Sequence, residues 1–147
     1  GARRGEALGM TWVEIDMERS IWVLPPERNK ANRDKVIPLS QRALNVLQRR
    51  RDNGSEYVFP NPETGKPLKH FYGTWDRIRK AAGLPDVRLH DLRHSYASFL
   101  VNNGRSLYEV QRMLGHSQLS TTQRYAHLTE DTLKDATEIV GSLVGKW

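Results

Sequence analysis

Two histidines and an arginine gather on one side of a predicted helix in the second half of the chain. At about 100° of rotation per residue, His90, Arg93, His94 and Ala97 share one face of this helix. Such a face is either a solvated polar surface or a functional site. As a site it would suit chemistry on an anion, because guanidinium groups bind oxyanions and imidazoles exchange protons near neutral pH.

A metal site is the weaker interpretation of the same residues. His90 and His94 are at positions i and i+4, a spacing at which two imidazoles can hold one metal ion. A zinc protease would carry glutamate after the first histidine, but Asp91 stands there and no third ligand is evident. The sequence therefore predicts neither a metal site nor another cofactor.

Composition restricts the class of protein further. The chain has 147 residues, a size that suits one domain, and 23 Lys and Arg against 17 Asp and Glu give a net charge of +6. The absence of cysteine excludes a disulfide framework and a thiol nucleophile. No apolar run approaches the roughly 20 residues that span a bilayer. These features predict a soluble, cytoplasmic domain with no membrane contact and with a polyanion among its partners.

The hydrophobic pattern predicts a small antiparallel sheet followed mainly by helices. Val13, Ile15 and Met17 alternate with polar residues in a first strand, and residues 21–24 and 35–39 offer two more. Capping residues and glycines bound the helices, which are predicted over residues 40–51, 68–82, 89–103, 106–114, 119–124 and 129–144.

Two of these helices carry a prediction about packing. In the helix over 89–103, one face is apolar and is predicted to form the core stripe; its residues are Leu89, Leu92, Tyr96 and Phe99. The last helix, over 129–144, also has an apolar stripe, which could dock on its own domain or on a neighbouring protomer.

The order and spacing of the polar residues resemble the catalytic core of the tyrosine recombinases, the phage integrase family of site-specific DNA recombinases. Three segments carry the resemblance. They are His90-Asp91-Leu92-Arg93-His94, similar to the H-x-L-R-H box, Leu114-Gly115-His116, similar to the L-G-H box, and Tyr125-Ala126-His127, similar to the nucleophile segment, with Thr122 three residues before the tyrosine.

Two further residues are placed by the same resemblance in the first part of the chain. The segment Gly1-Ala2-Arg3-Arg4-Gly5-Glu6 is similar to the family's G-x-R-x-x-E box, which would make Arg3 the first catalytic arginine. The catalytic lysine is expected in the loop after the second strand. Lys30, eight residues before Pro38, matches the family spacing. Lys35 is the alternative, and it could instead contact phosphate or be a solvated strand lysine.

The resemblance implies a mechanism without metal or ATP. Tyr125 would attack a DNA phosphodiester to give a 3′-phosphotyrosine and a free 5′-hydroxyl, after which another strand attacks and is joined. The expected roles are stabilisation of the phosphorane by Arg3 and Arg93, proton acceptance or orientation by His90, a hydrogen bond to the phosphate from His116, and general acid catalysis by Lys30. His94 and His127 are expected to support neighbouring groups.

The resemblance also implies a fold and a context. The fold is α+β, mainly α, with a small N-terminal three-stranded antiparallel sheet packed against a helical bundle. Residues 1–147 are expected to be the catalytic domain of a bacterial or phage-encoded recombinase, cut short at its N-terminus and lacking the core-binding domain. The expected partner is double-stranded DNA, with a monomer as the isolated fragment and a tetramer on paired DNA sites.

A non-catalytic DNA-binding module is the competing hypothesis. Two short helices between Ser106 and Tyr125 superficially resemble a helix-turn-helix unit, and a degenerate recombinase could bind without cutting. Type IB topoisomerases and telomere resolvases share the tyrosine chemistry, but the C-terminal boxes match integrases more closely. The run Arg49–Arg51 is either a contact to DNA phosphate or an exposed face. A pure binder has no reason to assemble the predicted catalytic set, Arg3, Lys30, His90, Arg93, His116 and Tyr125.

Overall fold

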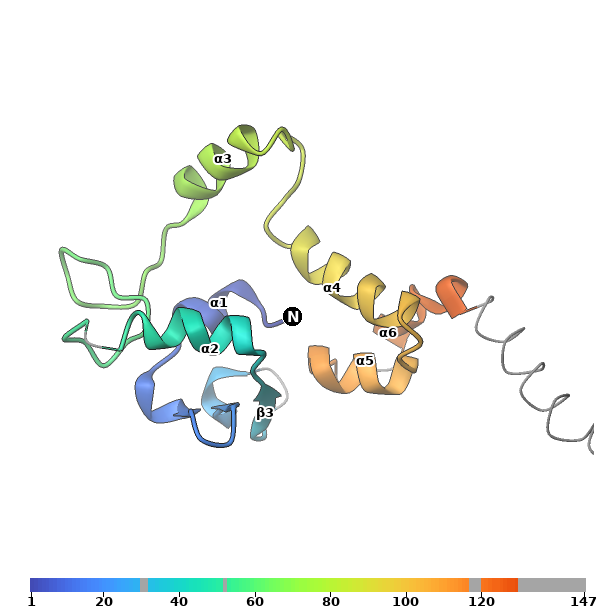
Figure 1. Ribbon diagram of the computed structural model, residues 1–147, viewed down its shortest axis with the longest axis horizontal. Coiled ribbons are helices and arrows are strands. Elements are labelled where there is room, and N and C mark those ends of the chain that lie inside the picture. The colour runs from blue at the N-terminus through green and yellow to red at the C-terminus, as the bar shows by residue number, and fades with distance from the viewer. Residues whose placement is uncertain (30–31, 52, 117–119, 130–147) are drawn as a thin grey trace, which may run out of the picture. The chain divides into compact units, whose positions relative to one another are not determined.

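The computed structural model describes residues 1–29, 32–51, 53–116 and 120–129. The chain forms two compact units (Figure 1). One comprises Ala2–His90, and the other comprises Gly1 together with Asp91–Trp147. Each unit has its own cluster of buried apolar side chains, so each is described by itself.

The unit Ala2–His90 contains the predicted three-stranded antiparallel sheet, in the order β1-β2-β3. Its strands are β1 (Ile15–Asp16), β2 (Ile21–Leu24) and β3 (Lys35–Pro38). Trp22 on the central strand pairs with Ile15 on one side and Ile37 on the other. The alternation along β2 buries Trp22 and Leu24 and leaves the intervening residues half-buried, as expected for a sheet with one covered face.

The predicted first strand is wrong at its beginning. Instead of a strand from Val13, a short 3₁₀ turn η1 (Trp12–Glu14) precedes β1, and the Val13 side chain is 95% exposed. The cause is a capping box, in which the Thr11 backbone N–H donates to Glu14 Oε2 at 3.2 Å. The turn therefore interrupts the alternation of apolar and polar residues from which the strand was predicted.

The core of this unit lies between the sheet and one helix. Helix α2 (Gln41–Gln48) begins at Ser40, whose hydroxyl accepts from the Ala43 backbone N–H at 3.3 Å. Leu47 of α2 is buried with Met10, Trp22, Leu24 and Val58. The other elements of the unit are α1 (Arg4–Leu8), η2 (Pro26–Arg28) and α3 (Tyr72–Ala81). Helix α3 is therefore shorter at its start than the predicted helix over 68–82.

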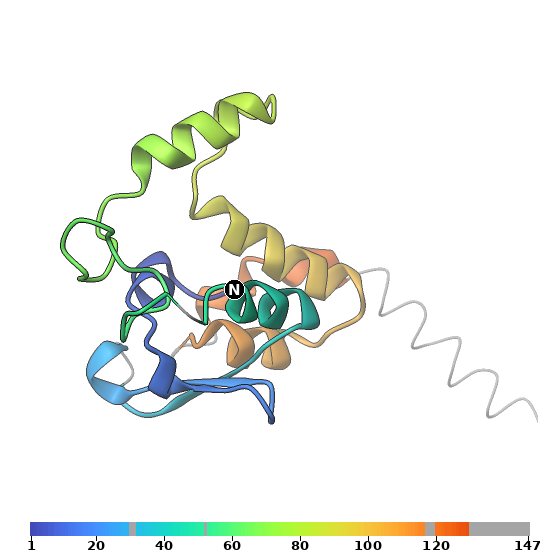
Figure 2. The ribbon, with the colours of Figure 1, turned by 60° about the vertical axis from the view of Figure 1, so that its left-hand side comes forward.

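The second unit is a small helical cluster. It contains α4 (Asp91–Asn102), α5 (Leu107–Leu114), α6 (Ser120–Gln123) and the 3₁₀ helix η3 (Ala126–Thr129). Helices α4 and α5 lie side by side (Figures 1 and 2). Gly104, at a φ of 74°, follows the end of α4, and a Ser106–Glu109 capping box opens α5. These predicted boundaries are confirmed.

The predicted core face of α4 is wrong. Leu92 is 49% exposed and Phe99 is 67% exposed, whereas Arg93, Ala97 and Val101 are buried. The small side chains of Ala97 and Val101 pack with the α5 residues Val110 and Leu114 and with Tyr125; Tyr96 and Leu100 pack at the edge. Leu89 precedes α4 and is half-buried. Counting large apolar residues favoured the wrong face, because the buried face holds small residues and an arginine whose head group is hydrogen-bonded.

The predicted last helix, over 129–144, lies outside the described residues apart from Thr129, the final residue of η3. Among the described helices, none is long and apolar enough to cross a membrane.

Candidate active site

Arg93 is fixed inside the second unit by backbone carbonyls. Its side chain emerges from the first turn of α4, and the residue is 7% exposed. Nη2 donates to the Leu114 carbonyl at 2.7 Å, and Nη1 donates to the Gly1 carbonyl. These two contacts hold the guanidinium in one orientation without cancelling its charge, since a carbonyl is a dipole and not an anion.

Each residue of the Leu114-Gly115-His116 segment has a different structural role. Leu114 is a fully buried core residue whose carbonyl accepts from Arg93. Gly115 ends α5 at a φ of 66°, in the left-handed region that favours glycine. The chain then reverses, and His116 Nδ1 lies 2.9 Å from the Thr122 hydroxyl. Thr122 is 0% exposed, so this contact fixes the imidazole from the interior.

Tyr125 is a buried phenol with a hydrogen-bonded hydroxyl. It lies between α6 and η3 and is 5% exposed. Its hydroxyl lies 2.7 Å from Nδ1 of His94, which projects from α4, and the two ring planes are inclined by 46°. Burial raises the pKa of Tyr125 above its ordinary value, against the opposing charges of Arg124 and Arg93. The phenol is therefore neutral at physiological pH.

Arg3 is anchored in the other unit by a buried carboxylate. Glu6, in α1, accepts from the Arg3 backbone N–H at 2.9 Å and from Arg3 Nη1 at 2.8 Å. Lys35 at the start of β3 places Nζ 3.4 Å from the same carboxylate. Burial alone would raise the pKa of Glu6, but the hydrogen bonds from Arg3 and the nearby charges of Lys35 and Arg3 bring it below its ordinary value.

The predicted site residues are divided between the two units, and one of them lies outside the described residues. Arg93, His116 and Tyr125 lie in one unit, and Arg3 lies in the other. His90 is an exposed residue immediately before α4. Lys30 lies outside the described residues, so its proposed role stays a prediction beside the alternative, Lys35. Within the described ranges, no three His, Cys, Asp or Glu side chains come together as a metal site.

Sequence reasoning did not assign a role to Glu6 or Glu14, and it expected His94 to support a neighbouring group without naming Tyr125 as that group. Glu6 was visible only as the last letter of the G-x-R-x-x-E box, although its i+3 spacing from Arg3 is that of a capping box. Glu14 has the same spacing from Thr11, and its carboxylate accepts from Trp22 Nε1 at 2.9 Å and from Arg28 Nη1. The contact of His94 with Tyr125 crosses 31 residues of sequence, and no local pattern indicates it.

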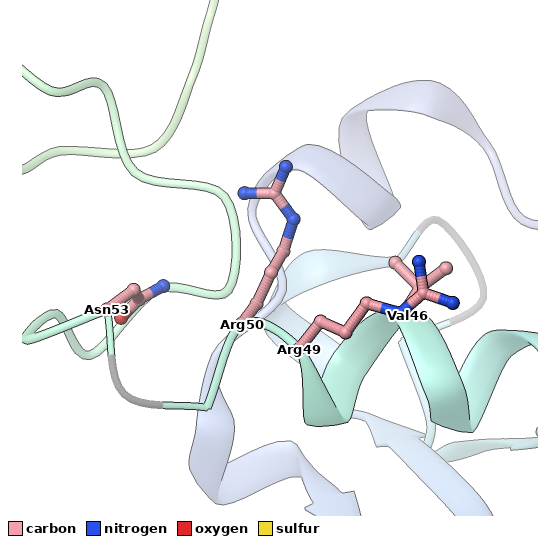
Figure 3. A pocket seen from close by; sticks show the side chains of 4 residues that line it. All are labelled: Val46, Arg49, Arg50 and Asn53. Atoms are coloured by element: carbon pink, nitrogen blue, oxygen red, sulfur yellow. The ribbon is translucent and has the colours of Figure 1, made fainter.

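A basic hollow lies at the end of α2. It is lined by Val46, Arg49, Arg50 and Asn53 (Figure 3). The Arg50 guanidinium lies 5.1 Å from the centre of the Phe59 ring, a cation–π distance. Asn53 is held by donating to the carbonyls of Tyr57 and Val58. Two guanidinium groups beside a hollow could receive a phosphate group.

Known proteins resemble the chain along nearly all of its length. The integrase of Salmonella phage P22 is 32% identical and is matched over 99% of this chain and 41% of its own. The tyrosine recombinase XerD of Halalkalibacterium halodurans is also 32% identical, over 92% of this chain and 48% of its own. The chain thus spans about half the length of the curated relatives it matches.

Solved structures share the fold. The XerA recombinase superposes with a TM-score of 0.69 at 25% identity, covering 92% of this chain and 50% of that one. The XerH site-specific recombinase, in a pre-cleavage complex with its difH substrate, superposes with a TM-score of 0.73 at 25% identity, covering 94% and 42%. The catalytic domain of bacteriophage HP1 integrase has the same fold, with a TM-score of 0.64 at 22% identity, covering 92% and 73%. The α+β fold predicted from the sequence is confirmed.

The family model described as the phage integrase family matches residues 1–132, which include each of the three C-terminal boxes and the arginine box. The resemblance expected from the sequence is therefore confirmed, and the chain belongs to the phage integrase family.

Proposed function

We propose that residues 1–147 are the catalytic domain of a site-specific DNA recombinase or integrase, and that Tyr125 is its nucleophile. The observation that carries the proposal is that Arg93, His116 and Tyr125 lie in one unit and each has its polar group hydrogen-bonded there. Tyr125 shares a buried cluster with Leu114, whose carbonyl accepts from Arg93. A phenol, a fixed guanidinium and a fixed imidazole are the groups that phosphoryl transfer needs.

The proposed reaction exchanges one ester for another. The Tyr125 oxygen attacks phosphorus, its O–H bond breaks, and the bond from phosphorus to the 5′-oxygen breaks. The products are a 3′-phosphotyrosine and a 5′-hydroxyl, from which a second strand's 5′-hydroxyl can restore a phosphodiester. The bond energy is kept throughout, so the reaction needs no ATP, and arginine supplies the charge that a metal would otherwise supply.

The other predicted residues complete the mechanism. Arg3 and Arg93 stabilise the charge on the non-bridging oxygens, and His116 donates a hydrogen bond to the phosphate. His90 orients the reacting groups or accepts a proton. Lys30 protonates the departing 5′-oxygen. The contact of Lys35 with Glu6 supports Lys30 for this role, because an ammonium held by a buried carboxylate is not free to follow the leaving group.

The proposed partner is double-stranded DNA. The net charge of +6 supports it, as do relatives named as integrases and recombinases. By the same analogy, the full-length protein carries a core-binding domain, works in the cytoplasm, and assembles as a tetramer on paired sites, while the catalytic domain alone is a monomer. Light scattering that found a stable tetramer of this domain without DNA would contradict that assembly.

A covalent trapping assay tests the proposal. The full-length protein is mixed with a nicked duplex from which the 5′-hydroxyl strand escapes after cleavage, so that a covalent adduct accumulates. We expect an adduct that maps to Tyr125 by mass spectrometry and is absent from the Tyr125→Phe variant. A folded protein that binds the duplex but forms no adduct would favour the competing hypothesis, a DNA-binding module without catalysis.

A further inference from the structure

His94 lies in hydrogen-bonding contact with the hydroxyl of Tyr125, the proposed nucleophile. Its Nδ1 lies 2.7 Å from the Tyr125 hydroxyl, and the rings are tilted with centroids 6.3 Å apart. Both residues belong to one unit: His94 lies on α4, and Tyr125 lies just before η3. An imidazole nitrogen at this distance can accept the phenol proton.

The buried phenol needs such a partner in order to react. Tyr125 is nearly excluded from solvent, so water has little access to its proton. A neutral phenol is a weak nucleophile and is activated by an adjacent base. His90, which was expected to accept a proton or to orient the reacting groups, is exposed, whereas His94 lies in hydrogen-bonding contact with the Tyr125 oxygen.

We propose that His94 is a catalytic residue of the cleavage reaction, which holds the Tyr125 hydroxyl and accepts its proton at Nδ1 as the oxygen bonds to phosphorus. The inference rests on the proposed function. The electron pair of the O–H bond forms the new bond to phosphorus, and the pair of the breaking ester bond leaves with the 5′-oxygen. That oxygen receives its proton from the general acid, so the protons and electrons balance.

The difference in acidity sets when the proton moves. An ordinary imidazolium has a pKa of about 6.5, and an ordinary phenol about 10, so the proton stays on Tyr125 until the bond to phosphorus begins to form. Several titratable or charged groups lie on the elements packed around the pair. They are Asp91, Arg93 and Tyr96 on α4, Tyr108, Glu109 and Arg112 on α5, His116 after α5, Arg124 before Tyr125, and His127 on η3.

The test compares two substitutions of His94 in the full-length protein. In His94→Asn, the side-chain amide occupies the position of Nδ1 and keeps a hydrogen-bonding atom there, but it cannot take a proton. His94→Leu removes both functions. The rate of adduct formation is measured in single-turnover experiments on the nicked duplex. His70→Asn, at an exposed residue in the other unit, is the matched control.

We expect His94→Asn and His94→Leu to slow adduct formation by about 10²-fold or more at pH 8, with unchanged DNA affinity and no loss in His70→Asn. The ratio of the wild-type rate to the His94→Asn rate should fall as the pH drops below about 6.5, because protonated His94 cannot accept a proton. The other ionisable groups are the same in both proteins, so their effects largely cancel in the ratio. A ratio that is independent of pH, or a His94→Asn variant at the wild-type rate, would overturn the inference.

A second substrate distinguishes the role of the proposed base, His94, from that of the general acid, Lys30. When sulfur replaces the bridging 5′-oxygen, the leaving thiolate needs no proton. On this substrate, a variant that lacks the general acid, Lys30→Ala, should recover the wild-type rate of adduct formation. The His94→Asn variant should remain slow. Rescue of His94→Asn would contradict proton acceptance by His94. A wild-type protein that gives no adduct would instead overturn the proposed function, whereas an adduct at Tyr125 with unaffected His94 variants would overturn the inference alone.

Discussion

The two units hold their candidate catalytic residues by different means. In Ala2–His90, the cations Arg3 and Lys35 meet at the buried carboxylate of Glu6. In the other unit, Arg93, His116 and His94 contact neutral groups, among them two carbonyls, a threonine hydroxyl and the phenol of Tyr125. The Glu6 carboxylate brings one negative charge to the two positive charges of Arg3 and Lys35, whereas a carbonyl or a hydroxyl fixes a side chain without adding a charge. The comparison teaches that neutral dipoles can fix a guanidinium in one orientation without placing a negative charge beside it.

The largest effect is expected at Arg93. Arg93→Lys should lower the rate of adduct formation by about 10²- to 10³-fold, because a lysine cannot reproduce the planar fork of donors. It should also lower the free energy of unfolding by about 1–3 kcal/mol, since the carbonyls of Leu114 and Gly1 lose a donor. Chemical denaturation and single-turnover kinetics measure the two effects.

Arg3→Lys is the matched variant for this comparison. Glu6 would retain Lys35 and the Arg3 backbone N–H as partners, so the loss of stability should be smaller than for Arg93→Lys. Equal losses of stability in the two variants would show that carboxylate and carbonyl anchoring are not different in kind.

Glu6→Gln tests the carboxylate anchor. We expect it to lower the free energy of unfolding at pH 7 by about 1–3 kcal/mol. Because the folded-state pKa of Glu6 lies below its ordinary value, its contribution is present above the unfolded-state pKa, about 4.3, and is lost as the pH falls through the folded-state value. Denaturation at pH 7 and at lower pH measures this. Glu27→Gln, at an exposed carboxylate in η2, should show no such difference, and a Glu6→Gln deficit that persists in acid would contradict the electrostatic cause.

Thr122→Val tests one of the neutral contacts of the second unit, the hydrogen bond to His116. The substitution conserves volume but removes the hydroxyl 2.9 Å from His116 Nδ1. Loss of one such hydrogen bond is worth about 1 kcal/mol, so we expect adduct formation to slow about five- to tenfold. Thr122→Ser keeps the hydroxyl and should retain most of the rate. If both variants were equally slow, packing at this fully buried position and not the hydrogen bond would be responsible.

The smallest effect is expected at the basic hollow at the end of α2 (Figure 3). If Arg49 and Arg50 contact DNA phosphate, replacing either by Gln should reduce the slope of log affinity against log salt by about one. Arg42→Gln, at an exposed residue near the start of the same helix, is the control. A slope that changes equally for Arg42→Gln and Arg50→Gln would indicate a general charge effect with no phosphate contact at the hollow.

Local signals in the sequence predicted much of the fold. Ser40 and Ser106 began helices where expected, and Gly104 and Gly115 followed helix ends. These signals work because a cap and its partner lie within four residues of each other. The pattern failed where a distant partner decided the outcome. Helix α4 buries Arg93 and exposes Phe99, because the carbonyl that receives the guanidinium belongs to Leu114, 21 residues away.

The candidate site shows the same limit. The types and order of Arg3, Arg93, His116 and Tyr125 could be read from their motifs, because family boxes are local. Glu6 lies three residues from Arg3 in the same box, but the more distant partners could not be read in this way. Lys35 reaches Glu6 across 29 residues of sequence, and His94 reaches Tyr125 across 31. Such pairings depend on how the elements pack, which no spacing rule specifies.

The packing of the second unit restricts the residue type at Gly1, because there is little room for a Cβ atom there. A Cβ at this position would lie 2.7 Å from the Tyr96 ring, closer than real Cβ atoms approach, and 3.1 Å from a Leu114 methyl group, which is a tight contact. The Gly1 carbonyl, meanwhile, accepts from Arg93. In a saturation library, alanine should therefore already be depleted here, although the residue is exposed. The glycine that begins the arginine box is then required by the packing of the unit that holds Arg93, 92 residues further along the chain.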